Sequence, residues 1–143
     1  MACRRPAGTD PGARRLRRDR RAANVADMSK PLGPYSPVVR AGDFVIVSGQ
    51  GGMADGKKVS GGVAAETEQT MKNVAAQLAT VGATLADVVK TTCFLTDMEN
   101  FGAFNEAYAA ALGSHRPARS TIGVAALPAG FLVEVEAWAY KPE

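Results

Sequence analysis

The last patterned stretch of the chain, from Leu132 to Tyr140, alternates apolar residues with glutamate or aromatic residues. Successive side chains of a β-strand point to opposite faces of its sheet. One face of this strand therefore carries Val133, Val135, Ala137 and Ala139, and the other carries Glu134, Glu136, Trp138 and Tyr140. We expect helices to cover the first face. The second face is also partly apolar, so something must cover it, most simply another copy of the chain.

Upstream of this strand, the sequence alternates between strand-like and helix-like patterns. Short apolar runs on both sides of Gly42 predict a β-hairpin, and the glycine-rich stretch 49–62 predicts a loop. Apolar residues at helical spacing predict one helix that Gly82 ends and a second helix that Asp97 caps. Between them, a run rich in β-branched residues predicts a strand covered on both faces. The expected order is β-β-α-β-α-β-β, over residues 38–40, 44–48, 63–81, 88–95, 97–112, 119–124 and 132–140.

This order predicts an α+β fold, with a single sheet and two helices packed on one face. A length of 143 residues, 46% of them apolar, suits one domain with a core and leaves little room for two. The first 27 residues hold eight arginines and three aspartates, and we expect them to form a disordered, arginine-rich extension. The folded domain is expected at 28–143. For the extension, an RNA-binding or targeting arm and a segment upstream of a natural start at Met28 are the alternatives.

Charge and residue usage exclude several classes of protein. Residues 28–143 hold nine basic and eleven acidic residues, a net charge of −2, and offer no basic surface for nucleic acid. No apolar stretch approaches the about 18 residues of a membrane span. Two cysteines, Cys3 and Cys93, cannot form a disulfide framework, so a reducing, cytoplasmic location is the simplest interpretation. His115 is the one histidine, and we expect no metal site.

Three other features suggest catalysis, but their surroundings do not support it. The segment 51–57 resembles a phosphate-binding loop, yet Lys58 stands where a serine or threonine must hold magnesium. His115 lies in a polar loop and is expected at the surface. Cys93 lies in the middle of an apolar strand, where a cysteine is usually a small core residue.

Side-chain alternation also groups the polar residues near the end of the chain. We expect Ile122 and Val124 to point into the core. Arg119 and Thr121 then lie on the opposite face, together with Glu134. A guanidinium binds a carboxylate through two parallel hydrogen bonds, and a partly desolvated glutamate can move protons or orient water. The pair therefore suits a site for a small carboxylic acid, although a plain salt bridge between subunits would use the same residues.

Several short segments together resemble one family, the RidA/YjgF enamine and imine deaminases. No segment is specific alone, but the set occurs in unbroken order from about Gly33 to Tyr140. The matching segments are 33–36 (GPYS), 48–50 (SGQ), 89–92 (VKTT) with Asp97, 104–108 (FNEAY), 116–120 (RPARS) and 133–137 (VEVEA).

The resemblance implies a chorismate-mutase-like subunit in a homotrimer, with active sites in the clefts between subunits. It implies that Arg119 holds the carboxylate of the substrate and that Glu134 positions and activates a water molecule. By correspondence, the other pocket residues are Tyr35, Gly49, Asn105 and Thr121. Tyr35 and Asn105 could equally be a turn-packing aromatic residue and a helix-surface amide.

The same resemblance implies hydrolysis of reactive 2-imino acids and their enamine tautomers, such as 2-aminoacrylate, 2-iminobutanoate and 2-iminopropanoate, to 2-oxo acids and ammonia. No cofactor is implied, because the imine carbon is already electrophilic. The alternative is a non-catalytic trimer of the same fold that binds small ligands or acts like a chaperone. The presence of both Arg119 and Glu134 argues against that alternative.

The chain departs from the common family pattern at two positions of the same strand. Thr121 stands where many members have cysteine, and Gly123 stands where many have glutamate. A hydroxyl group can still donate a hydrogen bond to a bound carboxylate or water. Gly123 is expected to leave a roomier and less negative cleft, which would admit a bulkier imino acid.

Overall fold

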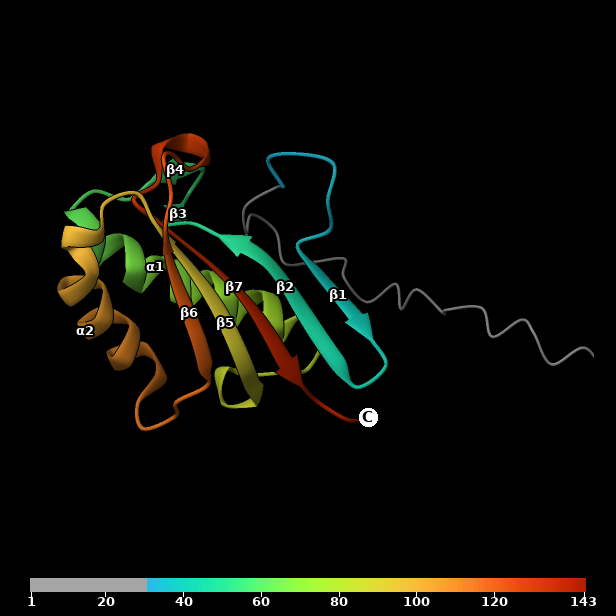
Figure 1. Cartoon of the computed structure of the whole chain (residues 1–143). Helices are drawn as coiled ribbons and strands as arrows, with labels where there is room; N and C mark the ends of the chain where they lie inside the picture. Colours follow the sequence, from blue (N-terminus) through green and yellow to red (C-terminus); the bar gives the residue numbers. More distant parts are fainter. Residues whose placement is uncertain (1–30) are drawn as a thin grey trace, which may run out of the picture.

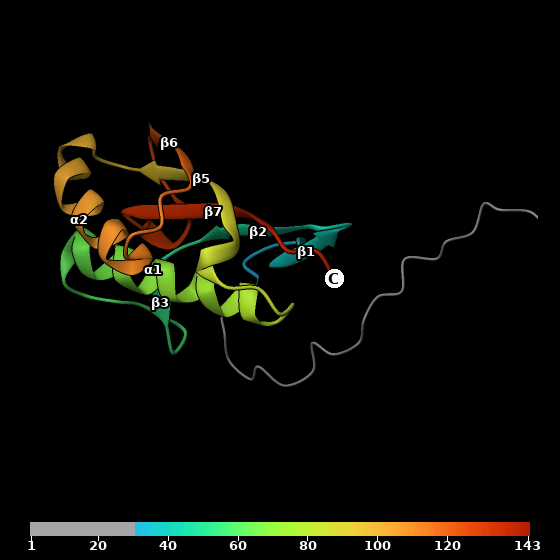
Figure 2. The same cartoon turned by 90° about the horizontal axis from the view of Figure 1, so that it is seen from below.

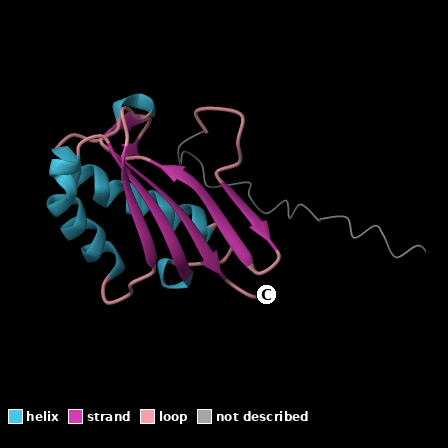
Figure 3. Ribbon diagram, viewed as in Figure 1, coloured by secondary structure: helices cyan, strands magenta, loops and turns pink. Residues whose placement is uncertain are grey.

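The computed structural model describes residues 31–143, which form one main sheet with two long helices (Figure 1 and Figure 3). The predicted extension at 1–27 lies outside the described residues. In chain order, the strands and α-helices are β1 Val38–Ala41, β2 Phe44–Gln50, β3 Met53–Ala54, β4 Lys57–Lys58, α1 Gly62–Ala79, β5 Val88–Leu95, α2 Phe101–Leu112, β6 Ala118–Gly123 and β7 Val133–Tyr140. Short 3₁₀ turns at Leu85–Asp87, Met98–Asn100 and Pro128–Gly130 precede β5, α2 and β7.

The alternating strand, β7, lies in the middle of a five-stranded mixed sheet. The strand order is β1-β2-β7-β5-β6. β5 and β6 are parallel, and parallel neighbours need a long crossover connection, which α2 provides. All other neighbouring strands of this sheet are antiparallel. Figure 2 shows both helices on the same side of the sheet. The predicted α+β fold, with two helices on one face of a single main sheet, is confirmed.

The predicted division of β7 between its two faces is also confirmed. Its four small apolar residues are 0% exposed and belong to one core cluster with both helices. From α1 the core takes Met71, Val74 and Leu78, and from α2 it takes Phe104, Tyr108 and Leu112. The sheet therefore buries one complete face against the helices.

The glycine-rich stretch 49–62 is not only a loop. It contains a second, two-stranded sheet in which Met53 pairs with Lys58 around a turn at Asp55 and Gly56, both of positive φ. Strands of two residues leave no alternation for a sequence pattern to detect.

The helix boundaries differ slightly from the prediction. Gly82 follows α1 with a φ of 77°, the left-handed conformation expected of a glycine beyond a helix end. Asp97 caps the 3₁₀ turn before α2 rather than α2 itself, since its carboxylate accepts a hydrogen bond from the Glu99 amide at 2.9 Å. The turn then continues directly into Phe101, the first residue of α2.

The other face of the main sheet, which we call the open sheet face, is uncovered in the single chain. Phe44 stacks edge-on against Trp138 and Tyr140, with ring centroids 6.1 and 5.5 Å away. The large apolar residues exposed on this face, between 41% and 47% each, are Val39, Phe44, Ile122, Trp138 and Tyr140. β5, predicted to be covered on both faces, is therefore buried on its helix-facing side only.

β6 points its polar side chains in the direction opposite to the one predicted. Arg119 is paired with Thr91 of β5, whose side chain is buried against the helices. Paired residues on neighbouring strands share a face of the sheet, so Arg119 points toward the helices. Thr121, two residues later, points in the same direction. Ile122, expected in the core, is 46% exposed on the open sheet face. The prediction that Arg119 and Glu134 share a face is therefore wrong.

The position of β6 at the sheet edge explains this reversal. Its inner side meets the aromatic residues of α2, and aromatic rings accept the aliphatic stem and guanidinium of an arginine. Its outer side places Ile122 next to Phe94 of β5. An edge strand with a single large apolar residue thus has no alternation strong enough to fix its orientation.

Candidate functional site

Glu134 lies in a cavity of about 520 Å³, which we call the Glu134 cavity. The proline-rich segment 31–37, the end of β2 and the start of β7 enclose it. Tyr35 and Gly49, two of the predicted pocket residues, line the same cavity. The structure therefore brings three of the six predicted site residues together.

Gly49 is a glycine because the Glu134 side chain occupies the space beside it. A Cβ atom built on Gly49 would overlap the Glu134 carboxylate. The carboxylate thus lies directly on the backbone of β2, in contact with a strand that cannot move away without breaking the sheet. Only the backbone of Gly49 can therefore take part in the cavity.

The environment of Glu134 favours its protonated form. Burial is the main cause that raises the pKa of this carboxyl above its ordinary value, and the negative charge of Glu136 raises the pKa further. Both glutamates lie on the open sheet face and are half-buried. A carboxylate with a raised pKa is a stronger proton acceptor than an ordinary glutamate.

Tyr35 is held at the cavity mouth by its own segment. Its hydroxyl oxygen accepts a hydrogen bond from the Leu32 amide at 3.1 Å, and its ring lies against Gly33. The side chain is 46% exposed. The entry segment therefore folds back on itself and presents the Tyr35 ring to the cavity.

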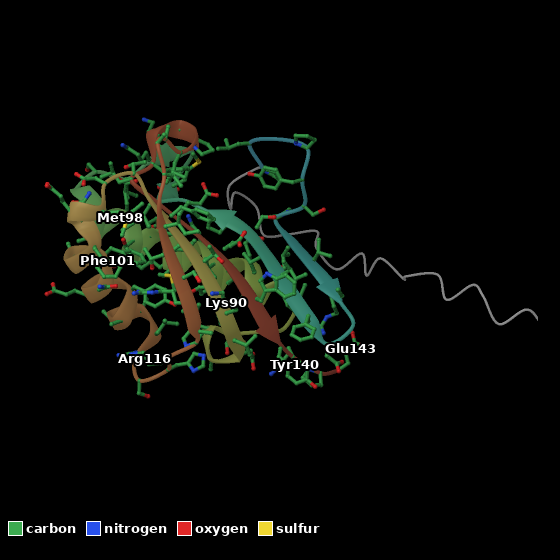
Figure 4. The ribbon with its side chains drawn as sticks, viewed as in Figure 1. Lys90, Met98, Phe101, Arg116, Tyr140 and Glu143 are labelled. Atoms are coloured by element: carbon green, nitrogen blue, oxygen red, sulfur yellow. The ribbon has the colours of Figure 1, made fainter. Side chains whose placement is uncertain are left out.

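Arg119 lies on the other side of the sheet, in a separate group of residues. Its guanidinium carbon is 5.6, 5.4 and 4.9 Å from the ring centroids of Phe101, Phe104 and Tyr108. Tyr108 is fixed in turn by a 2.7 Å hydrogen bond between its hydroxyl and that of Thr91. Figure 4 shows Phe101 on the α2 side of the molecule, far from Tyr140 at the end of β7.

The surroundings of Arg119 are short of hydrogen-bond partners. None of the three ion pairs found among residues 31–143 includes Arg119. The buried side-chain oxygens of Asn105 and Thr121 also find no partner within the described part of the chain. Asn105 lies four residues after Phe101 and three residues before Tyr108, so the three side chains share one face of α2. We call Arg119, Asn105 and Thr121 the Arg119 cluster.

The predicted site residues thus lie in two separate groups, which we call the two halves, and a single chain does not bring them together. β5 separates the strands that carry Arg119 and Glu134, and the two side chains point to opposite faces. The Glu134 cavity holds a half-buried carboxyl group and has no cation in its lining, whereas the Arg119 cluster holds a cation and has no carboxylate partner within residues 31–143. Each half supplies what the other lacks.

Sequence reasoning missed the aromatic support of Arg119. The apolar spacing that predicts the second helix includes Phe101, Phe104 and Tyr108, and Phe104 and Tyr108 are buried. Phe101 is instead 38% exposed. The spacing of the aromatic residues by three and four positions could have indicated this aromatic face of the helix. Its contact with Arg119 could be predicted only from the orientation of β6.

The features rejected as catalytic have structural roles. Burial raises the pKa of Cys93 to about 11, so this thiol is protonated at neutral pH and is no nucleophile. His115 is half-buried rather than at the surface, and its Nε2 lies 2.7 Å from the Val88 carbonyl oxygen. Lys57 and Lys58 form the short strand β4 instead of opening a helix, so no phosphate-binding loop is present there.

Gly123 does not leave the open space that the sequence suggested. A Cβ atom on Gly123 would lie 3.0 Å from Cγ of Met98, whose side chain already covers this position. Met98 is itself 44% exposed at the start of the turn before α2 (Figure 4). Any additional room at Gly123 therefore depends on movement of the flexible Met98 side chain.

Asn73 of α1 fixes the wall of the Glu134 cavity from behind. It is 4% exposed, and its Nδ2 donates hydrogen bonds of 2.9 Å to the carbonyl oxygens of Gly51 and Met53. Its Oδ1 accepts a hydrogen bond from Gln69. One buried amide therefore ties α1 to the segment that follows Gly49.

Replacing Asn73 by alanine is expected to lower the free energy of unfolding by about 1–3 kcal/mol, because two backbone acceptors lose their donor in a buried place. Urea denaturation measures the change. Gln69→Ala is the matched control, since it removes only the bond to Asn73 and leaves both backbone bonds intact. Equal stability of Asn73→Ala and the unmodified protein would contradict the anchoring role.

Two further properties concern residues 31–143 as a whole. None of their helices is long and apolar enough to cross a membrane. Nor do they contain a group of three or more histidine, cysteine, aspartate or glutamate side chains placed to hold a metal ion.

Comparison with known proteins identifies relatives over almost all of the described region. A family model for Endoribonuclease L-PSP matches residues 26–141. A human 2-iminobutanoate/2-iminopropanoate deaminase is 42% identical over 124 residues, which cover 85% of this chain and 90% of the relative.

Solved structures show the same fold. RidA from an Antarctic Psychrobacter is 37% identical with a TM-score of 0.71, over 78% of this chain and 91% of that chain. TdcF from E. coli, crystallised with bound serine, is 31% identical with a TM-score of 0.72, also over 78% and 91% of the two chains.

Proposed function

The chain belongs to the Endoribonuclease L-PSP family, the RidA/YjgF family that its motifs resemble, and from this membership we propose that it hydrolyses 2-imino acids and their enamine tautomers. The products are 2-oxo acids and ammonia. One observation supports the proposal: the chain presents an arginine without a carboxylate partner among residues 31–143 and, on the opposite face of the sheet, a glutamate with a raised pKa. The activity named for the human relative supports the same chemistry.

The two halves meet if copies of the chain assemble, and we propose a homotrimer in which each Arg119 cluster faces the Glu134 cavity of a neighbour. The open sheet face supports assembly, because soluble monomers rarely leave several large apolar side chains exposed on one face. In a closed ring of three copies every chain gives one half-site and receives the other. Each trimer then holds three identical active sites.

In this arrangement Arg119 binds the carboxylate of the substrate. Its planar guanidinium donates two parallel hydrogen bonds to a carboxylate, and the rings of Phe101, Phe104 and Tyr108 keep the group from turning away. The buried oxygens of Asn105 and Thr121 have no partner within the described residues, and we propose that in the assembled site they accept hydrogen bonds from the imine nitrogen or from a water molecule.

Glu134 carries out both proton transfers. Its carboxylate accepts a proton from water while the water oxygen bonds to the carbon of the protonated imine, which gives a neutral carbinolamine. The resulting carboxylic acid returns the proton to the amine nitrogen. The carbon–nitrogen bond then breaks as the hydroxyl becomes a carbonyl, and ammonium leaves with the hydroxyl proton. The raised pKa of Glu134 suits it to both steps.

The direct test generates 2-iminobutanoate in solution from threonine with a threonine dehydratase and follows its decay. Full-length protein is expected to accelerate the decay, and Arg119→Ala protein is expected not to do so. A folded, trimeric protein that leaves the decay unchanged would contradict the enzymatic proposal and favour the ligand-binding alternative.

Glu136→Gln is expected to shift the pH dependence of the reaction. Glu136 raises the pKa of Glu134, so its neutralisation lowers that pKa and keeps the carboxylate ionised at lower pH. The fall of kcat/KM on the acidic side should therefore move to lower pH, while the rate at high pH changes little. A pH profile from 4 to about 9 measures the shift. If kcat/KM of the variant falls at the same acidic pH as that of the wild type, protonation of Glu134 does not cause this fall.

A further inference from the structure

Phe131 forms the wall of the Glu134 cavity just before β7, and its ring is seated on Gly51. The side chain is 5% exposed and lines the same cavity as Glu134. A Cβ atom on Gly51 would overlap three atoms of the ring. Gly51 is absent from the glycines of positive φ, so its backbone would accept any residue. The closest contacts that a side chain at this position would make are all with the Phe131 ring.

The cavity is larger than the smallest imino acids require. Pockets of about 300–1,000 Å³ commonly hold drug-sized ligands, and a four-carbon imino acid fills only part of 520 Å³. The polar groups of the lining gather on the sheet, at Ser48, Gln50 and Glu134. The remaining lining is mainly apolar, and its members include Leu32, Pro37, Met53, Pro128 and Phe131.

The proposed reaction fixes how a substrate would lie in this space. Its carboxylate is bound by Arg119 of a neighbouring subunit, and its imine carbon lies beside Glu134. The substrate's own side chain must then extend along the apolar part of the lining. We propose that Phe131, seated on Gly51, contacts this side chain and selects 2-imino acids with apolar side chains larger than that of 2-iminobutanoate. This inference rests on the proposed function.

The test compares kcat/KM for imines made in solution by an amino-acid oxidase from leucine, phenylalanine and 2-aminobutyrate. The wild-type protein is expected to favour the two larger imines. Phe131→Ala should lower the ratio of large-substrate to small-substrate kcat/KM by about 10-fold or more, the usual effect of a lost pocket contact. Gly51→Ala should also lower the ratio, because the displaced ring enters the space of the larger side chain.

A double variant makes the test specific for the pair. In the Phe131→Ala background the added methyl group of Gly51→Ala meets no ring, so the ratio should not fall further. Val81→Ala, a packing change outside the cavity, is the control for general loss of stability. If Phe131→Ala does not fold, Phe131→Leu replaces it in the test, because leucine keeps an apolar wall but lacks the ring.

The outcomes separate the two proposals. If the wild-type protein hydrolyses no imine, the proposed function itself is wrong. If it hydrolyses 2-iminobutanoate but folded Phe131 variants keep the wild-type substrate ratio, only the specificity role of Phe131 is overturned. Additive effects of Gly51→Ala and Phe131→Ala would likewise contradict the proposed contact.

Discussion

Replacing Glu134 by glutamine is expected to lower kcat for imine hydrolysis by about 10²- to 10⁴-fold, the usual contribution of a general acid–base group. Glutamine keeps the size and most of the contacts of the side chain, including its close approach to Gly49. It cannot take a proton from water or return one to the leaving nitrogen. Stopped-flow measurement of imine decay at saturating substrate would give kcat directly.

The stability of the same variant provides an internal control. Folding raises the pKa of Glu134, so the ionised carboxylate costs stability at pH values above its folded pKa, and that cost disappears as the pH falls below the unfolded pKa. Glu134→Gln should therefore unfold at a higher urea concentration than the wild type at pH 7, with a smaller difference at pH 4. A variant that has lost activity through poor folding would instead unfold at a lower urea concentration than the wild type.

Replacing Arg119 by alanine is expected to lower kcat/KM by about 10²-fold or more, mainly through a higher KM. Each hydrogen bond to a charged group contributes about 1.5–3 kcal/mol, and a guanidinium makes two such bonds to one carboxylate. Arg119→Lys keeps the charge but loses the planar pair of donors, so its activity should lie between those of alanine and arginine. Steady-state kinetics with 2-iminobutanoate would separate KM from kcat.

Arg116 offers a matched control for this experiment. It lies three residues before Arg119, and its Nη1 donates hydrogen bonds to the carbonyl oxygens of Gly113 and His115 in the loop before β6. Arg116→Ala removes the same charge from the same segment without touching the Arg119 cluster. Equal losses in the two variants would indicate a general electrostatic effect instead of carboxylate binding by Arg119.

Much of the fold could be predicted because its central strand has an unambiguous pattern. In β7 each of the four small apolar residues is 0% exposed, and each intervening residue is half-buried or exposed. The helices were equally clear, since their buried stripes follow helical spacing. The small β3–β4 hairpin could not be predicted, because two residues per strand carry no periodicity.

The site was predicted less completely than the fold, and β6 shows why. The identities of Arg119 and Glu134 came from motif order, but their placement on one face came from alternation in a strand with only one large apolar residue. The contacts that orient Arg119 lie between β6 and α2, elements that local sequence patterns do not relate. The resemblance implies an active site between subunits, and the separation of Arg119 and Glu134 within one chain is the arrangement that such a site would require.

Mixing two inactive variants tests the shared site most directly. Arg119→Ala and Glu134→Gln chains, each expected to be nearly inactive alone, are unfolded together in equal amounts, refolded and separated by size. Random assembly of trimers places an intact Arg119 opposite an intact Glu134 at about one quarter of the interfaces. The mixture is therefore expected to recover about a quarter of the wild-type activity. A mixed trimer as inactive as its parents would contradict a site built from two subunits.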